Sequence, residues 1–286
     1  MSKKVIITAD STCDLGAELE KRFNVTQLSR LCICYGEQAL RDGAEITPDE
    51  IYERFYADGT LPKTSAYSVG EYLDIFSPYV NDGCEVVHIS LGSGLSCSCS
   101  NAKLAAEQLE GVYVVDSQSL STGSGLLVCE AAEMIEQGMC AKDIAEKLES
   151  LVPNCHASFI LDTLKFLAAG GRCSALASFG ANLLSIKPGI NVDNTKGGAM
   201  GVGKKYRGKF EKCVEQYVKD QLSAYEKYSR KRVFITHSGI YDGIEDMVKK
   251  VVAETGLFDE IFVTRAGCTI SSHCGPNCIG VLFMTE

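Results

Sequence analysis

The sequence predicts an α/β protein with two domains, and two observations support this prediction. The chain has 286 residues, which corresponds to about two domains of roughly 150 residues each. In its first half, short apolar runs alternate with amphipathic segments of helical length, as is typical of parallel strands joined by helices. From Pro153 onward the spacing becomes irregular, which indicates a second α/β domain with a mixed sheet. We therefore expect domains at residues 1–152 and 153–286.

The first half offers clear boundaries for its elements. Thr47-Pro48-Asp49-Glu50 and Ser68-Val69-Gly70-Glu71 are capping boxes, and each predicts the start of a helix. Apolar runs predict strands at residues 5–9, 86–90 and 112–115, and helical patterns predict further helices at 101–109, 126–137 and 141–151. A Ser- and Gly-rich loop is expected at residues 116–125.

The second half mixes shorter strands with helices. Strands are predicted at residues 158–161, 189–192, 233–237, 261–264 and 279–284. Helices are predicted near Leu164 and at residues 175–184, 210–228 and 244–255.

Composition excludes several classes of protein. A formal net charge of −9 argues against nucleic-acid binding, because phosphate contacts need clustered Lys and Arg. No apolar stretch approaches the length of a membrane span, so we expect a cytoplasmic protein without a transmembrane segment. The 14 cysteines are scattered, and the tightest cluster, at residues 273–278, lacks the second ligand pair of a structural zinc site. We expect neither a metal nor a cofactor.

The stretch ISLGSGLSCSCSNA, at residues 89–102, joins a predicted strand to a predicted helix. Its Gly94-Leu95-Ser96-Cys97-Ser98 is close to the nucleophile elbow of serine hydrolases, but Ser98 replaces the second glycine. A second interpretation makes Ser96 a helix cap. The third, which we favour, is a cradle of backbone amides and hydroxyls for an anion at the start of a helix.

Four other loops carry polar or glycine-rich motifs. Residues 198–205 resemble a P-loop, but Lys205 stands where the motif needs Ser or Thr, so we expect a glycine hairpin turn and no ATP site. The hydroxyl-rich residues 63–68 lead into a capped helix. Gly170-Gly171-Arg172 fits either an aimed guanidinium or a helix C-cap. His273, expected between two strands, is either a core residue or a charged partner for an anion.

Taken in order along the chain, these short motifs resemble those of one family. In the first half they are DSTCDL at residues 10–15, Thr64-Ser65 with Ser68, SGLS at 93–96 and VDS at 115–117. In the second half they are Gly170-Gly171-Arg172, Lys187-Pro188, Arg207, Ser272-His273 and Gly275-Pro276. Over essentially its whole length the chain resembles the DegV family of bacterial fatty-acid-binding proteins. It departs at Cys97, Ser98 and Cys99, where the family usually has Gly, Thr and Tyr.

The resemblance implies a DegV-like fold of two α/β domains with a lipid site between them. It implies that Thr64 and Ser96 bind the carboxylate of a long-chain fatty acid, with Arg172 and His273 beside it and the acyl chain in an apolar tunnel. Cys97 then contributes a side chain close to this site. It further implies a carrier rather than an enzyme, which presents the fatty acid to an ATP-dependent fatty acid kinase that forms an acyl phosphate.

Arg207 is our candidate for contact with that kinase partner. Two alternatives stay open at this point. A serine hydrolase would use Ser96, for which His156, His237 and His273 are only generic partners. A lipid-sensing regulator would bind the ligand without any kinase partner.

Overall fold

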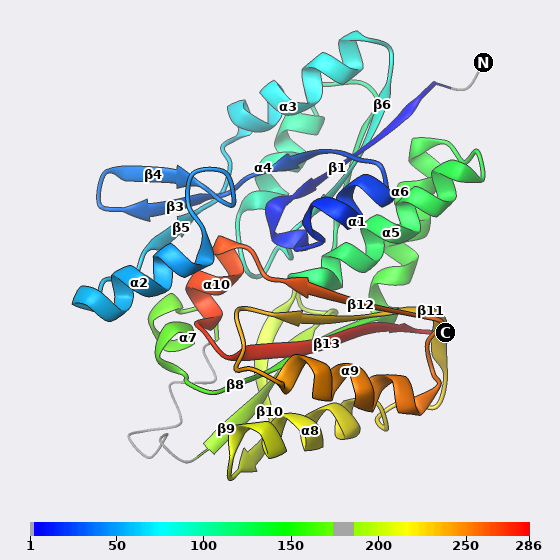
Figure 1. The fold of residues 1–286 in the computed structure, drawn as a ribbon. Coiled ribbons are helices and arrows are strands. Elements are labelled where there is room, and N and C mark those ends of the chain that lie inside the picture. The colour runs from blue at the N-terminus through cyan, green and yellow to red at the C-terminus, as the bar shows by residue number, and fades with distance from the viewer. Residues whose placement is uncertain (1–2, 174–185) are drawn as a thin grey trace.

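The structure is a computed structural model and describes residues 3–173 and 186–286 (Figure 1). Its first sheet has the order β2–β1–β6–β7, and every neighbouring pair is parallel. The strands are β1 (Val5–Asp10), β2 (Val25–Ser29), β6 (Glu85–Ser90) and β7 (Val112–Asp116). The predicted parallel sheet is thus confirmed.

Alternate residues of these strands pack against different helices. Ile6 and Val86 contact α3 (Val69–Asn81) and α4 (Ser98–Ala106), whereas Ile7 and Val87 contact α5 (Thr122–Glu136) and α6 (Ala141–Leu151). Because successive side chains of a strand point to opposite faces, helices cover both faces of the sheet. This explains why the strands read as continuous apolar runs.

A small antiparallel sheet lies beside this layer and was not predicted. It has the order β4–β3–β5 and consists of β3 (Cys32–Tyr35), β4 (Gln38–Arg41) and β5 (Lys63–Ser65). Strands of three or four residues are too short to show a clear alternation of polar and apolar residues. Next to this sheet lies α2 (Pro48–Asp58), and α1 (Gly16–Arg22) follows the short 3-10 helix η1 (Ser11–Cys13).

The second large sheet has the order β10–β9–β8–β13–β11–β12 and is antiparallel except for the pair β11–β12. Its strands are β8 (Cys155–Leu161), β9 (Ile186–Asp193), β10 (Ala199–Arg207), β11 (Tyr228–His237), β12 (Glu260–Arg265) and β13 (Cys278–Thr285). Helices α8 (Phe210–Gln221) and α9 (Ile244–Thr255) cover one face, as Figure 1 shows. The predicted mixed sheet is therefore confirmed.

Helix α5 packs against both large sheets. Its apolar residues share one core with Ile7 and Val87 of the first sheet and with Phe234 and Leu282 of the second. The strands of the first sheet all precede residue 152 and those of the second all follow it. The division into domains at that residue stays a prediction, because one continuous core joins the two sheets through α5.

Several predicted helix limits were wrong. Helix α4 begins at Ser98 rather than at 101, and α8 ends at Gln221, well before 228. Helix α5 begins at Thr122, so the predicted Ser- and Gly-rich loop is partly helical. A Cβ at Gly125 would lie 2.9 Å from the carbonyl oxygen of Cys13, so this glycine permits close packing instead of ending the helix. The helix predicted at 175–184 lies outside the described residues.

Other local predictions are confirmed. Both capping boxes form, at Thr47 with Glu50 and at Ser68 with Glu71. The glycine-rich stretch after Lys196 belongs to the hairpin that joins β9 to β10. The position of its turn was predicted wrongly: the turn covers residues 194–198, whereas residues 199–205 lie in β10.

Candidate functional site

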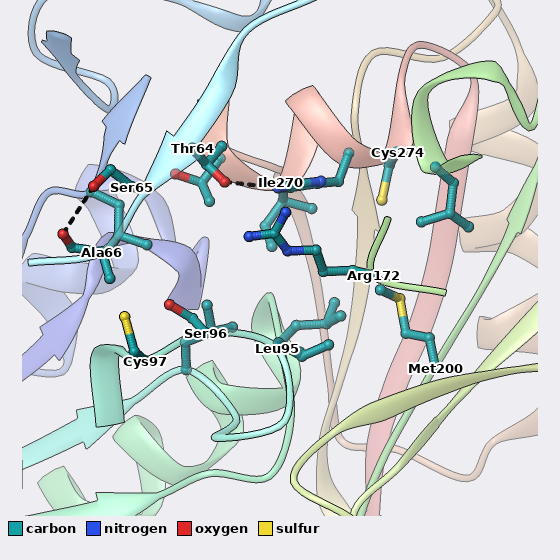
Figure 2. A pocket seen from close by; sticks show the side chains of 16 residues that line it. Thr64, Ser65, Ala66, Leu95, Ser96, Cys97, Arg172, Met200, Ile270 and Cys274 are labelled. Carbon is teal, nitrogen blue, oxygen red and sulfur yellow. Dashed lines mark hydrogen bonds between the residues drawn. The ribbon is translucent and has the colours of Figure 1, made fainter. Parts of the chain in front are cut away.

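A cavity of about 250 Å³ lies between elements of the first and second halves of the chain (Figure 2). Of the six residues proposed from the sequence, Thr64, Ser96, Cys97, Arg172 and His273 line it. The other lining residues are mainly apolar: Leu31, Ser65, Ala66, Leu91, Leu95, Leu120, Leu167, Met200, Thr269, Ile270 and Cys274. Arg207 lies elsewhere, exposed at the end of β10.

The apolar surface continues into a second, smaller cavity of about 30 Å³. The two cavities share Leu120, Ile270 and Cys274 as lining residues. The smaller one extends to Phe159 of β8 and Leu282 of β13. The first cavity therefore has a polar part near Thr64 and Ser96 and an apolar part toward the six-stranded sheet.

Thr64 is held at the cavity by the small sheet. It lies in β5, directly opposite Ile33 of β3, and Ile33 is fully buried. The Thr64 side chain is half-buried, and its Oγ1 lies 2.9 Å from Nε2 of His273. This hydrogen bond joins residues that are 209 positions apart in the chain. The small sheet thus brings a hydroxyl of the first half onto the imidazole of the second.

The loop that carries Ser96 is anchored by a buried carboxylate. Asp10, at the end of β1, accepts hydrogen bonds from the backbone amide of Leu91 and the hydroxyl of Ser90, both at 2.8 Å. The Tyr72 hydroxyl donates to the same side chain at 2.6 Å. Burial alone would raise the pKa of Asp10, but His88 and these hydrogen bonds outweigh it and hold the pKa below its usual value. A charged Asp10 therefore fixes the start of the loop.

The glycines of the same loop leave room for the turn of the β9–β10 hairpin, which packs against them. The amide of Gly94 donates to the carbonyl of Gly197 at 2.8 Å. A Cβ at Gly92 would lie 2.5 Å from that carbonyl oxygen and 3.0 Å from the backbone of Ser119. Only glycine therefore fits at Gly92 without displacing backbone. Gly197, directly before the stretch that resembled a P-loop, thus joins the turn of the hairpin to the serine loop.

Ser96 lies at the start of α4. Its Oγ accepts a hydrogen bond from the amide of Ser98 at 3.2 Å and lies 3.0 Å from the Ser98 hydroxyl. Ser96 therefore lies at a helix start, as predicted, but one residue before the N-cap, so the interpretation of Ser96 as the cap was wrong. Cys97 is the N-cap residue, and its side chain is exposed at the edge of the cavity.

The double glycine before Arg172 is a helix C-cap. Helix α7 (Lys165–Gly170) ends at Gly171, whose φ of 67° is in the left-handed region. The exposed Arg172 donates from Nη1 to the carbonyl of Gly170 at 2.9 Å, and Figure 2 shows its side chain within the cavity. Both interpretations of this motif therefore apply to the same three residues. A Cβ at Gly170 would overlap with Nδ1 of His273, so Gly170 also makes room for the imidazole.

His273 lies between β12 and β13, as predicted, but in a helix that was not predicted. Helix α10 (Cys268–Cys274) was missed because it is short and rich in Ser, Thr and Cys, which are weak helix formers. Burial lowers the pKa of His273 to about 4, and the charge of Arg172 acts in the same direction. The imidazole is therefore neutral at pH 7 in the ligand-free protein, and its role as a charged partner for an anion stays a prediction.

Two buried carboxylates hold the first turn of α10. Asp42 accepts hydrogen bonds from the amides of Cys268 at 2.7 Å and Thr269 at 3.0 Å, and Asp14 accepts one from Gly267 at 2.9 Å. Burial raises the pKa of Asp14 to about 8, and the nearby charge of Asp42 adds to this effect. Sequence reasoning missed these anchors, and also Thr269, which lines the cavity.

Among the described residues, no group of three or more His, Cys, Asp and Glu side chains is placed to hold a metal ion. All cysteines are free thiols, and most are buried. In the same part of the chain, no helix combines the length and apolar character that crossing a bilayer requires.

A family model for the DegV family of uncharacterised proteins matches residues 4–286. The chain belongs to the DegV family. A DegV domain-containing protein of Clostridium perfringens is 27% identical over 291 residues, with 99% of each chain covered. The predicted resemblance and the two-part α/β fold are thus confirmed.

Solved structures of DegV proteins extend the comparison to the fold. A structure described as fatty acid binding of a DegV family protein from Thermus thermophilus matches with a TM-score of 0.89 and 28% identity, covering 99% of this chain and 100% of that one. A stearic-acid-binding protein from Eubacterium ventriosum matches with a TM-score of 0.81 and 28% identity, covering 100% and 98%.

Proposed function

We propose that this DegV protein binds a long-chain fatty acid, with the carboxylate at Thr64 and Ser96 and the acyl chain along the apolar part of the cavity. One observation carries the proposal: Thr64, Ser96, Arg172 and His273 come from four separate segments and line a single cavity whose other lining residues are mainly apolar. The fatty acid ligands named for the Thermus thermophilus and Eubacterium ventriosum relatives support the same ligand class.

The hydrogen bond between Thr64 and His273 prepares a donor for the carboxylate. A neutral imidazole carries one N–H, and we assign it to Nε2, which lies 2.9 Å from Thr64 Oγ1. With Nε2–H donating to its oxygen, Thr64 is free to donate its own O–H to a ligand. Ser96 supplies the second hydroxyl. Charge-assisted hydrogen bonds of this kind contribute about 1.5–3 kcal/mol each.

These hydrogen bonds mainly offset the cost of removing the carboxylate from water. The acyl chain then supplies the affinity, since each buried methylene contributes about 0.8 kcal/mol. Ten methylenes give about 8 kcal/mol before the loss of translational and rotational freedom is subtracted. We therefore expect the polar residues to determine the orientation of the ligand, and the apolar surface to determine how tightly it binds.

The position of the polar residues suits a carrier that presents its ligand. Thr64 and Ser96 are half-buried, and Cys97 and Arg172 are exposed beside them, so a carboxylate at this site lies near the surface. We propose that an ATP-dependent fatty acid kinase reaches it there and converts it to an acyl phosphate. The exposed Arg207 is our candidate for contact with that partner. Ser96 pairs with Ser98 and His273 with Thr64, which disfavours a hydrolase based on a Ser96–His273 pair.

Native mass spectrometry of protein purified from a bacterial host tests the ligand directly, and we expect a co-purified fatty acid. The double variant Thr64→Val with Ser96→Ala should bind hexadecanoic acid at least about 30-fold more weakly, which corresponds to ~2 kcal/mol from the lost hydrogen bonds. Phosphorylation by the kinase partner should fall with it.

The matched control is Ser150→Ala with Thr255→Val, which removes two hydroxyls that bond local carbonyls at the ends of α6 and α9. Unchanged binding and phosphorylation in the Thr64 and Ser96 variant would refute the assignment. Labelling of Ser96 by a fluorophosphonate, with ester turnover in the absence of any partner, would instead establish the hydrolase. Ligand binding with no kinase partner would establish the regulator.

A further inference from the structure

The cavity contains a buried hydroxyl that the protein leaves without a hydrogen-bond partner. Within the described residues, eight buried side-chain polar atoms have no partner, and only Thr269 Oγ1 and His273 Nδ1 belong to residues that line the cavity. Thr269 is 4% exposed. Leaving such a group unpaired costs about 1–3 kcal/mol, so an unpaired hydroxyl on a residue that lines a ligand cavity points to a contact made by the ligand.

The other two hydroxyls of α10 each donate a hydrogen bond to a nearby backbone carbonyl. Ser271 donates to the carbonyl of Ala266 at 3.2 Å, and Ser272 donates to that of Cys268 at 2.7 Å. Such bonds to nearby carbonyls are the usual solution for Ser and Thr in helices. Thr269 makes none, although its backbone amide is fixed by Asp42 at 3.0 Å. The backbone of Thr269 is therefore held in place, while its hydroxyl has no partner within the protein.

The position of Thr269 on α10 relates it to the head-group residues. It lies four residues before His273, so both side chains share one face of the helix. Ile270 and Cys274, the next residues of the same two turns, also line the cavity. His273 in turn contacts Thr64. This face of α10 thus carries two lining residues of the cavity, His273 and Thr269, one turn apart.

We propose that Thr269 is a third hydroxyl of the head-group site and donates its O–H to the carboxylate of the bound fatty acid. This inference rests on the proposed function and deepens it. Thr64, Ser96 and Thr269 then approach the carboxylate from β5, from the start of α4 and from α10. Three neutral donors on separate elements define its orientation without a buried counter-charge.

Two substitutions test the proposal in delipidated full-length protein, with hexadecanoic acid and its methyl ester as probes. Thr269→Val keeps the shape of the side chain and removes the hydroxyl. We expect it to bind the acid about tenfold more weakly, and the ester within twofold of wild type. Because the variant also removes an unpaired buried group, the melting temperature of the ligand-free protein should rise. Thr269→Ser keeps the hydroxyl and should bind the acid within about threefold of wild type.

The opposite signs of the two Thr269→Val effects separate a ligand contact from a structural role. Unchanged affinity for the acid would overturn the inference, as would equal losses for acid and ester, which would indicate packing alone. A wild-type protein that binds the ester but not the acid, or neither probe, would refute the proposed function itself, and the inference with it.

Discussion

The two sides of the cavity hold their polar groups in different ways. The hydroxyl side, Thr64 and Ser96, is carried by a short strand and a loop that are fixed through backbone hydrogen bonds and through Asp10. The imidazole side, Arg172 and His273, is carried by the end of α7 and by α10. Here the guanidinium is exposed and the imidazole is buried and neutral. Neither side therefore places a fixed buried charge against the site.

This difference bears on how a carrier can bind an anion and still give it up. A buried ion pair is held tightly only when its geometry compensates for the loss of water, and it resists separation. Neutral donors cost less to expose when the ligand leaves. Under the proposed function, the hydroxyl side orients the carboxylate. On the imidazole side, His273 orients the Thr64 hydroxyl through their hydrogen bond, and the charge of Arg172 stays at the surface.

The largest expected effect concerns the support of the imidazole side. Because burial raises the pKa of Asp14 to about 8, the folded protein keeps a proton that the unfolded chain releases from about pH 4 upward. Stability should therefore fall as the pH rises from about 4 to 8, by up to about 1.4 kcal/mol for each pH unit. Asp14→Asn should flatten this dependence, as measured by urea unfolding at pH 5, 6, 7 and 8.

Glu53→Gln is the control for loss of one negative charge, because Glu53 is exposed on α2. It should leave the slope of stability against pH as in the wild type. Parallel curves for Asp14→Asn and wild type would show that Asp14 is charged in the folded protein. The support of α10 would then include an ionised Asp14.

The second prediction disrupts the hydroxyl side. Gly92→Ala places a Cβ 2.5 Å from the carbonyl oxygen of Gly197, so the hairpin turn must move away from the serine loop. We expect a loss of about 1–3 kcal/mol in unfolding free energy and weaker fatty acid binding. Gly201→Ala, in β10 of the hairpin, is the control for the added methyl group, because nothing lies within 4 Å of its added Cβ. Equal stability and affinity in both variants would show that the docked turn does not support the site.

The sequence predicted the features that depend on local patterns and missed those that depend on distant contacts. Periodicity and capping boxes identified the long helices, and α6 and α9 have the predicted limits. The family resemblance carried by the short motifs implied one site for Thr64, Ser96, Arg172 and His273, and these four residues line one cavity. The carboxylates that support α10 and the hydroxyl of Thr269 were missed, since their roles depend on contacts such as Asp42 with Cys268, which are 226 residues apart. No local pattern encodes a contact of that range.

The smallest expected effect tests the charge of the imidazole side. In ligand-free protein, His273 should titrate with a pKa of about 4, as followed by NMR of the imidazole nuclei. Arg172→Gln should raise that pKa, because the guanidinium charge disfavours the imidazolium. A bound carboxylate should raise it further. Affinity for fatty acid should change by about fivefold at most, since Arg172 is exposed to solvent.

His156 supplies an internal control for this titration. Burial lowers its pKa to about 4 as well, but it lies on β8 with Thr285 as its hydrogen-bond partner and does not line the cavity. Its titration should be the same in wild type, in Arg172→Gln and with ligand bound. If the two histidines shifted together, the change would be a general loosening of the fold. A shift confined to His273 would show that the imidazole side responds to the charges beside it.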